Sequence, residues 1–225
     1  MRATLTALIL GPSIAFANCT DDAMLVFDAS SSMSAVTASP DVPTRIVEAR
    51  AALRDALPSV APYRRIGLMV YGPGETTGCS HISLHFAPME NAADQIIADI
   101  EAVAPDGSTA LTWAVQAAVE LLMQDADKGT IVLVTDGEET CGARTCEIAM
   151  GIGAQSPDMT VHVIGFRMRA TYLSRDYSNF SSQNGGDPVG AECLAAHTGG
   201  LYVTATTIDE LVAALRETLG CALHS

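Results

Sequence analysis

The sequence predicts an α/β fold built on a doubly wound, mainly parallel six-stranded sheet, with one antiparallel edge strand and helices on both faces. Short apolar segments typical of buried strands alternate along the chain with longer segments whose apolar residues recur at helical spacing. This alternation is typical of parallel strands joined by helices that cover both faces of a sheet. Two strand-like segments, 65–72 and 81–87, are joined instead by the turn-rich GPGETTG, which predicts an antiparallel hairpin at one edge.

The first half of the chain contains three of the expected strands. The segment AMLVF, residues 23–27, is continuously apolar, as expected of a strand that is buried on both faces. A helix is expected over 44–57 because its apolar residues fall on one face, and Pro58 is expected to end it. The hairpin strands 65–72 and 81–87 follow, and the second alternates apolar and polar residues as an edge strand does.

The second half of the chain continues the alternation. Helices are expected over 91–103 and 109–123 because Ile, Leu and Val recur on one face of each, and Trp113 is assigned to the core with them. Three further strands are expected at 130–136, 160–166 and 201–205. The last helix begins at a capping box formed by Thr207 and Glu210.

Length and composition suit a single domain with a substantial core. The chain has 225 residues, of which 48% are hydrophobic and 17% charged, and it shows no internal repeat or linker. Residues 18–225 are therefore expected to form one domain. The 26 acidic and 12 basic side chains give a formal net charge of −14. This charge argues against a nucleic-acid partner, because phosphates attract a basic surface.

Residues 1–17 have the features of a secretory signal peptide. Arg2 supplies a positive charge, an apolar stretch follows, and Ala15 and Ala17 give the small-x-small pattern of a cleavage site. The apolar stretch is short for a membrane span, and no later apolar run is long enough for one. The protein is therefore expected to be exported, to the periplasm or the medium, without a transmembrane segment.

Six cysteines remain after cleavage at Ala17, and an even number in an exported chain predicts disulfide bonds. They are Cys19, Cys79, Cys141, Cys146, Cys193 and Cys221. Cys19 and Cys221 flank the domain, which favours a bond between its two ends. Cys141 and Cys146 are close enough in sequence for a local bond. A zinc site is the alternative, but CGARTC lacks a second cysteine or histidine pair to complete it.

Oxygen-bearing side chains gather in three segments at or near the carboxyl ends of predicted strands. They are Asp28, Ser30 and Ser32 after the first strand, Thr109 at the start of a helix, and Asp136 at the end of a buried strand. Ligands of doubly wound sheets bind outside the carboxyl ends of the strands, so these side chains are expected to converge there. Carboxylate and hydroxyl oxygens suit Mg²⁺, with Mn²⁺ or Ca²⁺ as the other hard cations expected.

These five residues resemble the metal-ion-dependent adhesion site of the von Willebrand factor type A domain family. Asp28-Ala29-Ser30-Ser31-Ser32 matches the family's DxSxS motif, while Thr109 and Asp136 match its later threonine and aspartate. The resemblance covers about residues 22–219, and segments such as CLAAHTGGLYV are similar to a bacterial exported subgroup. It implies a divalent cation held by the five residues and a protein partner whose Asp or Glu completes its coordination. An adhesion or assembly role is thereby implied.

The resemblance also bears on the disulfides. The family's strand order places the first strand centrally with the last helix returning near it, which implies that the termini meet and favours Cys19–Cys221. It further implies that Cys79 and Cys193 fall towards opposite sides of the sheet. Two pairings of the other four cysteines remain open. They are Cys141–Cys146 with Cys79–Cys193, or Cys79–Cys141 with Cys146–Cys193.

The irregular segment 167–189 follows a strand and is therefore expected at the same rim as Asp28. It contains Tyr172, Tyr177 and Phe180, which belong to the residue types that anchor protein interfaces. We expect this loop to contact the partner and to supply specificity, since every exposed carboxylate is alike to a metal ion.

Enzyme function is not expected. The sequence has no G-x-S-x-G elbow, no Walker loop and no G-x-G-x-x-G after a strand. One alternative is a metal-assisted hydrolase in which Glu138 or Glu139 serves as the base. Another is a structural exported domain whose metal site is vestigial. Metal titration of the mature protein distinguishes among these classes.

Overall fold

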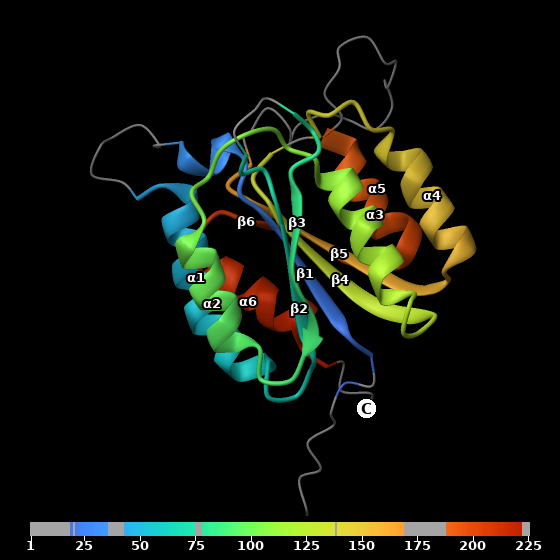
Figure 1. Cartoon of the computed structure of the whole chain (residues 1–225), viewed down its shortest axis with the longest axis horizontal. Helices are drawn as coiled ribbons and strands as arrows, with labels where there is room; N and C mark the ends of the chain where they lie inside the picture. Colours follow the sequence, from blue (N-terminus) through green and yellow to red (C-terminus); the bar gives the residue numbers. More distant parts are fainter. Residues whose placement is uncertain are drawn as a thin grey trace, which may run out of the picture.

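A computed structural model describes residues 19, 21–35, 43–74, 78–137, 139–168 and 188–221. These residues form one sheet of six strands in the order β3-β2-β1-β4-β5-β6 (Figure 1). The strands are β1 (Ala23–Asp28), β2 (Ile66–Tyr71), β3 (Ile82–Met89), β4 (Lys128–Thr135), β5 (Asp158–Phe166) and β6 (Tyr202–Ala205). Neighbours pair in parallel, except that β3 is antiparallel to β2 at one edge. The fold class predicted from the sequence is confirmed.

Helices cover both faces of the sheet (Figure 1). On one face lie α1 (Arg45–Val60), α2 (Ala93–Ala102) and α6 (Ile208–Leu219). On the other lie α3 (Leu111–Leu122), α4 (Thr145–Gln155) and α5 (Pro188–Thr198). A short 3₁₀ helix, η1 (Ser31–Ser34), follows β1 directly. The sheet therefore has a closed core on each side, and its carboxyl-terminal rim carries the loops.

The central strand β1 explains the unbroken apolar run AMLVF. All six of its residues are buried. Leu25 and Phe27 pack into the core beneath α1 and α6, whereas Met24 and Val26 pack into the core beneath α3. Because a strand presents successive side chains to opposite faces, a strand covered on both sides needs apolar residues at every position. The same position in the sheet places Asp28, the last residue of β1, at the middle of the rim.

Two expectations about the helices were wrong. Helix α1 continues through Pro58 to Val60 instead of ending before the proline. Pro58 lies in the last turn, where its missing N–H costs a single helical hydrogen bond and Ala61 N still donates to Leu57 O. Trp113, which we assigned to the core, is 41% exposed on α3, while Leu111 and Val115 are buried.

Three disulfide bonds join the six cysteines: Cys19–Cys221, Cys79–Cys141 and Cys146–Cys193. The expected bond between the two ends of the domain is confirmed, and of the two open pairings the crosswise one is present. The crosswise pairing follows from where the cysteines lie, since Cys146 on α4 and Cys193 on α5 belong to the same core, whereas Cys79 lies in the β2–β3 connection.

None of the helices in the described ranges combines the length and the hydropathy that a membrane span requires.

Candidate metal centre

Asp28 is anchored from beneath the rim. Its carboxylate is fully buried; Oδ1 accepts a hydrogen bond of 2.8 Å from Ser30 N, and Oδ2 accepts one of 2.7 Å from Thr135 Oγ1. Thr135 ends β4, the strand beside β1. The first bond shapes the turn that leads into η1, and the second ties the two central strands together. These two bonds hold the carboxylate at the base of the site without the help of a ligand.

The hydroxyl groups of Thr109, Ser30 and Ser32 form a chain of contacts that ends at Asp136. Thr109 Oγ1 donates to Ser30 Oγ at 3.2 Å, and Ser30 Oγ lies 3.1 Å from Ser32 Oγ. Ser32 Oγ in turn donates to Asp136 Oδ1 at 2.6 Å. The structure therefore brings all five residues of the sequence-predicted site into one hydrogen-bonded cluster. Four of them are buried, and Ser32 is partly exposed.

The loop after β4 holds Thr109 in place. Thr140 Oγ1 accepts from Thr109 N at 2.8 Å, and Thr140 N donates to Thr109 O at 3.0 Å. The buried carboxylate of Glu139 accepts from Thr112 N and from Cys141 N, at 2.9 and 2.6 Å. Both oxygens of Glu139, one of the bases considered for a hydrolase, are therefore bonded to backbone amides; Glu138 lies outside the described residues.

The approach of the loop before α3 depends on glycine. Gly107 has a φ of +77°, and a Cβ at this position would lie 2.1 Å from the carbonyl oxygen of Gly72. Such a contact is far inside van der Waals distance, and L side chains rarely adopt that φ. Gly107 O accepts a hydrogen bond from Ser31 N at 3.1 Å. This contact brings the loop that carries Thr109 against the turn that carries Ser30.

Arg45 is a residue of the site that sequence reasoning missed. Its Nη1 donates to Asp136 Oδ2 at 2.6 Å and to Ser32 O at 3.3 Å. Arg45 is only 8% exposed and stands at the start of α1. A positive charge is unfavourable at a helix N-terminus, where the helix dipole presents its own positive end. An arginine at that position therefore signals a carboxylate partner, although not which one.

The charges of the cluster do not balance. It contains two buried carboxylates, Asp28 and Asp136, and one guanidinium, Arg45. Burial, together with the neighbouring charge of Asp136, raises the pKa of Asp28 to about 6, although hydrogen bonds from Ser30 and Thr135 favour its ionised form. With both carboxylates ionised, the cluster has one unit of negative charge in excess, which favours a cation at this rim.

The donor set fits a hard divalent cation. It offers two carboxylates and three hydroxyls but neither histidine nor cysteine, and oxygen donors are those that Mg²⁺, Mn²⁺ and Ca²⁺ prefer. Across the ranges that the structure describes, no group of three or more His, Cys, Asp or Glu side chains is arranged to hold a metal. The cluster differs from such sites because hydroxyls make up most of its donors. The assignment of the five residues as metal ligands stays a prediction.

Residues 23–139 match the family model of the von Willebrand factor type A domain, and this match spans more than half of the 225 residues. The chain belongs to this family. The matched segment begins at β1 and ends just beyond Asp136, so it contains all three loops of the cluster. No curated protein matches the sequence.

Solved structures with the same fold come from several kinds of protein. An aerotolerance-related membrane protein from Bacteroides fragilis has 16% identity and a TM-score of 0.63, over 88% of this chain and 98% of its own. The pilus adhesin SpaC from Lactobacillus rhamnosus has 16% identity and a TM-score of 0.62, over 90% of this chain and 30% of its own. Proximal thread matrix protein 1 from the mussel byssus, with a zinc-occupied MIDAS motif, has 15% identity and a TM-score of 0.58, over 90% of this chain and 46% of its own. These likenesses establish the fold alone.

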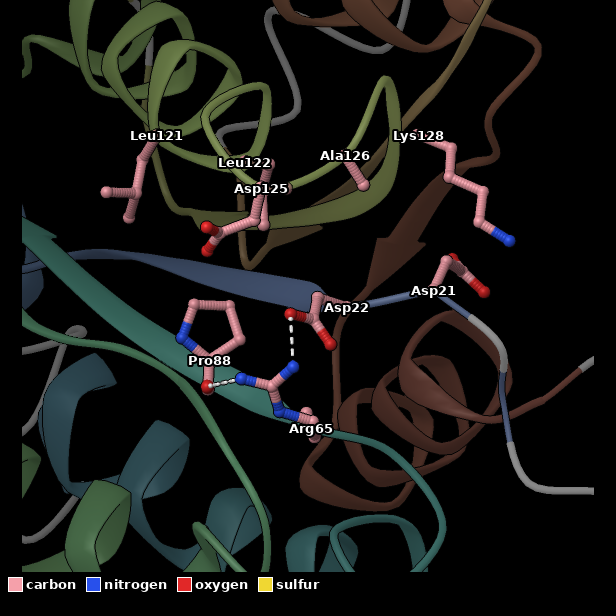
Figure 2. A pocket seen from close by; sticks show the side chains of 9 residues that line it. All are labelled: Asp21, Asp22, Arg65, Pro88, Leu121, Leu122, Asp125, Ala126 and Lys128. Carbon is pink, nitrogen blue, oxygen red and sulfur yellow. Dashed lines mark hydrogen bonds and ion pairs between the residues drawn. The ribbon is translucent and has the colours of Figure 1, made fainter.

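A hollow of about 190 Å³ lies at the amino-terminal ends of the parallel strands, opposite the cluster (Figure 2). It is lined by Asp21, Asp22, Arg65, Pro88, Leu121, Leu122, Asp125, Ala126 and Lys128. Figure 2 shows Arg65 directed at Asp22, and their charged groups lie 3.0 Å apart. Asp22, one of the three aspartates that line this hollow, is therefore already paired with a cation.

The proposed partner-binding side chains Tyr172, Tyr177 and Phe180 lie outside the described residues, as do residues 1–17. The signal peptide, its cleavage at Ala17 and the contact role of the loop stay predictions. Among the described residues, Trp113 is the candidate for a similar contact. It is exposed in the first turn of α3, four residues after Thr109.

Proposed function

We propose that this protein is an exported, metal-dependent protein-binding module with an adhesion or assembly role. Asp28, Ser30, Ser32, Thr109 and Asp136 would hold one divalent cation, Mg²⁺ or else Mn²⁺ or Ca²⁺. The protein partner would present an Asp or Glu to that cation. The observation that carries the proposal is the hydrogen-bonded cluster in which these five oxygen-bearing side chains meet.

The chemistry of the cluster suits reversible binding of a carboxylate. A bound divalent cation would supply an electrophilic position at which a partner's carboxylate oxygen replaces water. The chain itself contributes two carboxylates and three neutral hydroxyls. The negative charge of these donors therefore does not exceed the two positive charges of the cation. Asp28 is held by Ser30 and Thr135 and therefore needs little rearrangement on binding.

The surroundings of the cluster would select the partner. Trp113 lies in the first turn of α3, four residues after Thr109, and is 41% exposed; tryptophan is enriched among residues that dominate binding energy. With a formal net charge of −14, the protein repels acidic proteins at long range. The expected ligand therefore presents one acidic anchor within a neutral or basic surface, to which Tyr172, Tyr177 and Phe180 are proposed to contribute contacts.

Relatives and disulfides support this proposal without establishing it. One structural neighbour is a pilus adhesin and another has a zinc-occupied MIDAS motif. Three disulfide bonds accord with export to an oxidising compartment, the periplasm or the medium. We propose no enzymatic activity, and the engagement of Glu139 by two backbone amides gives the hydrolase alternative no support.

Isothermal titration calorimetry of the mature protein with MgCl₂ and MnCl₂ tests the metal site. We expect one ion to bind the wild type and no ion to bind the double variant Asp28→Asn, Asp136→Asn. Asn preserves the shape of each side chain, and circular dichroism checks that the fold survives. The control is Asp22→Asn with Asp125→Asn, which changes two aspartates at the opposite edge and should bind as the wild type does. Absence of binding to the wild type, or equal binding by the double variant, would overturn the assignment and favour a vestigial site.

A further inference from the structure

A line of alternating charges leads from the metal centre along helix α1. Arg45 contacts Asp136 at 2.6 Å, and Arg167 contacts Glu48 at 2.6 Å. Arg45 and Glu48 are three residues apart on the same helix, so their side chains lie on the same face of α1. Both are buried, with 8% and 5% of their surface exposed. None of these contacts beyond Asp136 belongs to the set of five ligand residues.

Three polar atoms in this line are left without partners. Arg45 Nε, Glu48 Oε2 and Arg167 Nε are buried and make no hydrogen bond to any described residue. A buried polar group without a partner is costly to leave unmatched. Burial raises the pKa of Glu48, while the charges of Arg167 and then Arg45 lower it, so the guanidinium of Arg45 already acts on this carboxylate. Arg45 thus binds one carboxylate, that of Asp136, and stands one helical turn from a second, that of Glu48, which keeps one oxygen without a partner.

We propose that Arg45 is an internal cation that competes with the divalent ion for Asp136, and that Glu48 is the acceptor to which Arg45 turns when the ion binds. This inference rests on the proposed function, because it concerns how the same site is regulated. Arg45 would thereby set the affinity of the centre, and Glu48 would limit the cost of displacing Arg45.

The contacts of Asp136 give the competition its physical basis. Its Oδ1 accepts from Ser32 and its Oδ2 accepts from Arg45, so both oxygens are engaged. A guanidinium this close repels any cation held by the same carboxylate, and the repulsion is strong where water is excluded. Turning Arg45 towards Glu48 releases Oδ2 and moves the positive charge away from the cluster. In the absence of an ion, Arg45 keeps Asp136 from being a buried, unpaired carboxylate.

The test measures Mg²⁺ affinity by calorimetry and Mn²⁺ affinity by electron paramagnetic resonance in four variants of the mature protein. Arg45→Met removes the competitor and should tighten binding at least about tenfold. Glu48→Gln removes the negative charge of the second acceptor and should weaken binding about threefold or more. That weakening should vanish in the double variant Arg45→Met, Glu48→Gln, because Glu48 acts through Arg45. The control Arg50→Met removes another arginine of α1, one that donates to Ile100 O and Val103 O, and should leave affinity within twofold.

Folding of each variant is checked by circular dichroism in EDTA. If Arg45→Met does not fold, Arg45→Gln keeps a donor for Asp136 while removing the charge, and it should still tighten binding. If the wild type binds the ion and the Arg45 variant binds it equally well or more weakly, this inference is overturned and the proposed function stands. Binding by Arg45→Met but not by the wild type supports the role of Arg45 and overturns metal dependence in the native protein. Failure of both proteins to bind overturns both proposals.

Discussion

The two ends of the parallel strands, called here the amino-terminal and carboxyl-terminal edges of the sheet, each carry an aspartate, an arginine and a hydroxyl residue. These groups have different partners at the two edges. At the amino-terminal edge, Asp21, Arg64 and Thr130 contact one another; Thr130 Oγ1 lies 2.7 Å from both Asp21 Oδ2 and Arg64 Nη2. At the carboxyl-terminal edge, Asp136 accepts hydrogen bonds from the hydroxyl of Ser32 and the guanidinium of Arg45. Aspartate, arginine and a hydroxyl residue therefore do not by themselves indicate a binding site.

The difference between the edges lies in charge balance and in the remaining partners. Arg64 balances Asp21 and also donates to the carbonyl oxygens of Leu219 and Gly220, so that it ties the end of α6 to the start of the sheet. The nearby hollow of Figure 2 contains a further pair, Asp22 with Arg65. At the other edge a second buried carboxylate, Asp28, has no cation of its own among the described residues. The balanced groups at the amino-terminal edge join the chain ends together, whereas the two carboxylates and single arginine at the other edge are the groups that we propose to bind a cation.

The largest expected effect comes from the disulfide at the amino-terminal edge. Cys19→Ser with Cys221→Ser opens a loop of 202 residues, and the chain-entropy argument gives a loss of about 5 kcal/mol in the free energy of unfolding. Metal affinity should stay within twofold, because the bond lies far from the cluster. Chemical denaturation and Mg²⁺ calorimetry measure the two quantities on the same protein. A large fall in affinity without unfolding would contradict the separation of the two edges.

The disulfide at the carboxyl-terminal edge should behave differently. Cys79→Ser with Cys141→Ser opens a shorter loop of 62 residues and should cost about 4 kcal/mol. It should also weaken Mg²⁺ binding severalfold, because Cys141 belongs to the loop whose Glu139 and Thr140 hold the start of α3 and Thr109. The pair Cys19→Ser, Cys221→Ser is the matched control, and equal metal affinities in the two variants would sink the idea.

Much of this comparison could be predicted from the sequence, because it depends on local patterns. Apolar runs located the buried strands and an alternating pattern located the edge strand β3, while the DxSxS segment with Thr109 and Asp136 located the five clustered residues. The contact of Arg45 with Asp136 could not be predicted in this way, since 91 residues separate the two and only the tertiary structure brings them together.

Helix α5 was also missed, and for a different reason. Its sequence PVGAECLAAHT has no apolar stripe, because small residues occur on all of its sides. It packs closely against α4, where a Cβ at Gly153 would lie 2.1 Å from His197 O. Close packing of small residues depends on the facing helix and leaves no periodic signal. The sequence instead placed an irregular segment up to residue 189, and α5 begins at Pro188.

Removing the arginine at each edge in turn should separate their roles. Arg64→Met leaves Asp21 without its cation and two carbonyl oxygens without the donor that Arg64 supplies, and it should lower the free energy of unfolding by about 2–3 kcal/mol. Added Mg²⁺ should not restore this loss, because no unbalanced carboxylate cluster lies at that edge within the described chain. Arg45→Met should lose stability in EDTA and regain it in excess Mg²⁺, since a ligand that binds only the folded state stabilises it. Thermal unfolding with and without Mg²⁺ makes the comparison, and recovery by both variants would contradict it.

The smallest expected effect is a pH dependence at the amino-terminal edge. Burial alone would raise the pKa of Asp21, but the hydrogen bond from Thr130 and the charge of Arg64 together lower it below its ordinary value of 3.8. Because the folded pKa lies below the unfolded one, the stabilisation by ionised Asp21 is complete above the unfolded value and is lost as pH falls through the folded value. The difference in unfolding free energy between wild type and Asp21→Asn should therefore be largest near neutral pH and should shrink below about pH 4. Asp55→Asn, on the exposed face of α1, is the control and should show no such trend. Chemical denaturation in EDTA from pH 7 to 2 measures both differences, and an Asp21 difference that is constant over this range would show that solvent screens the pair.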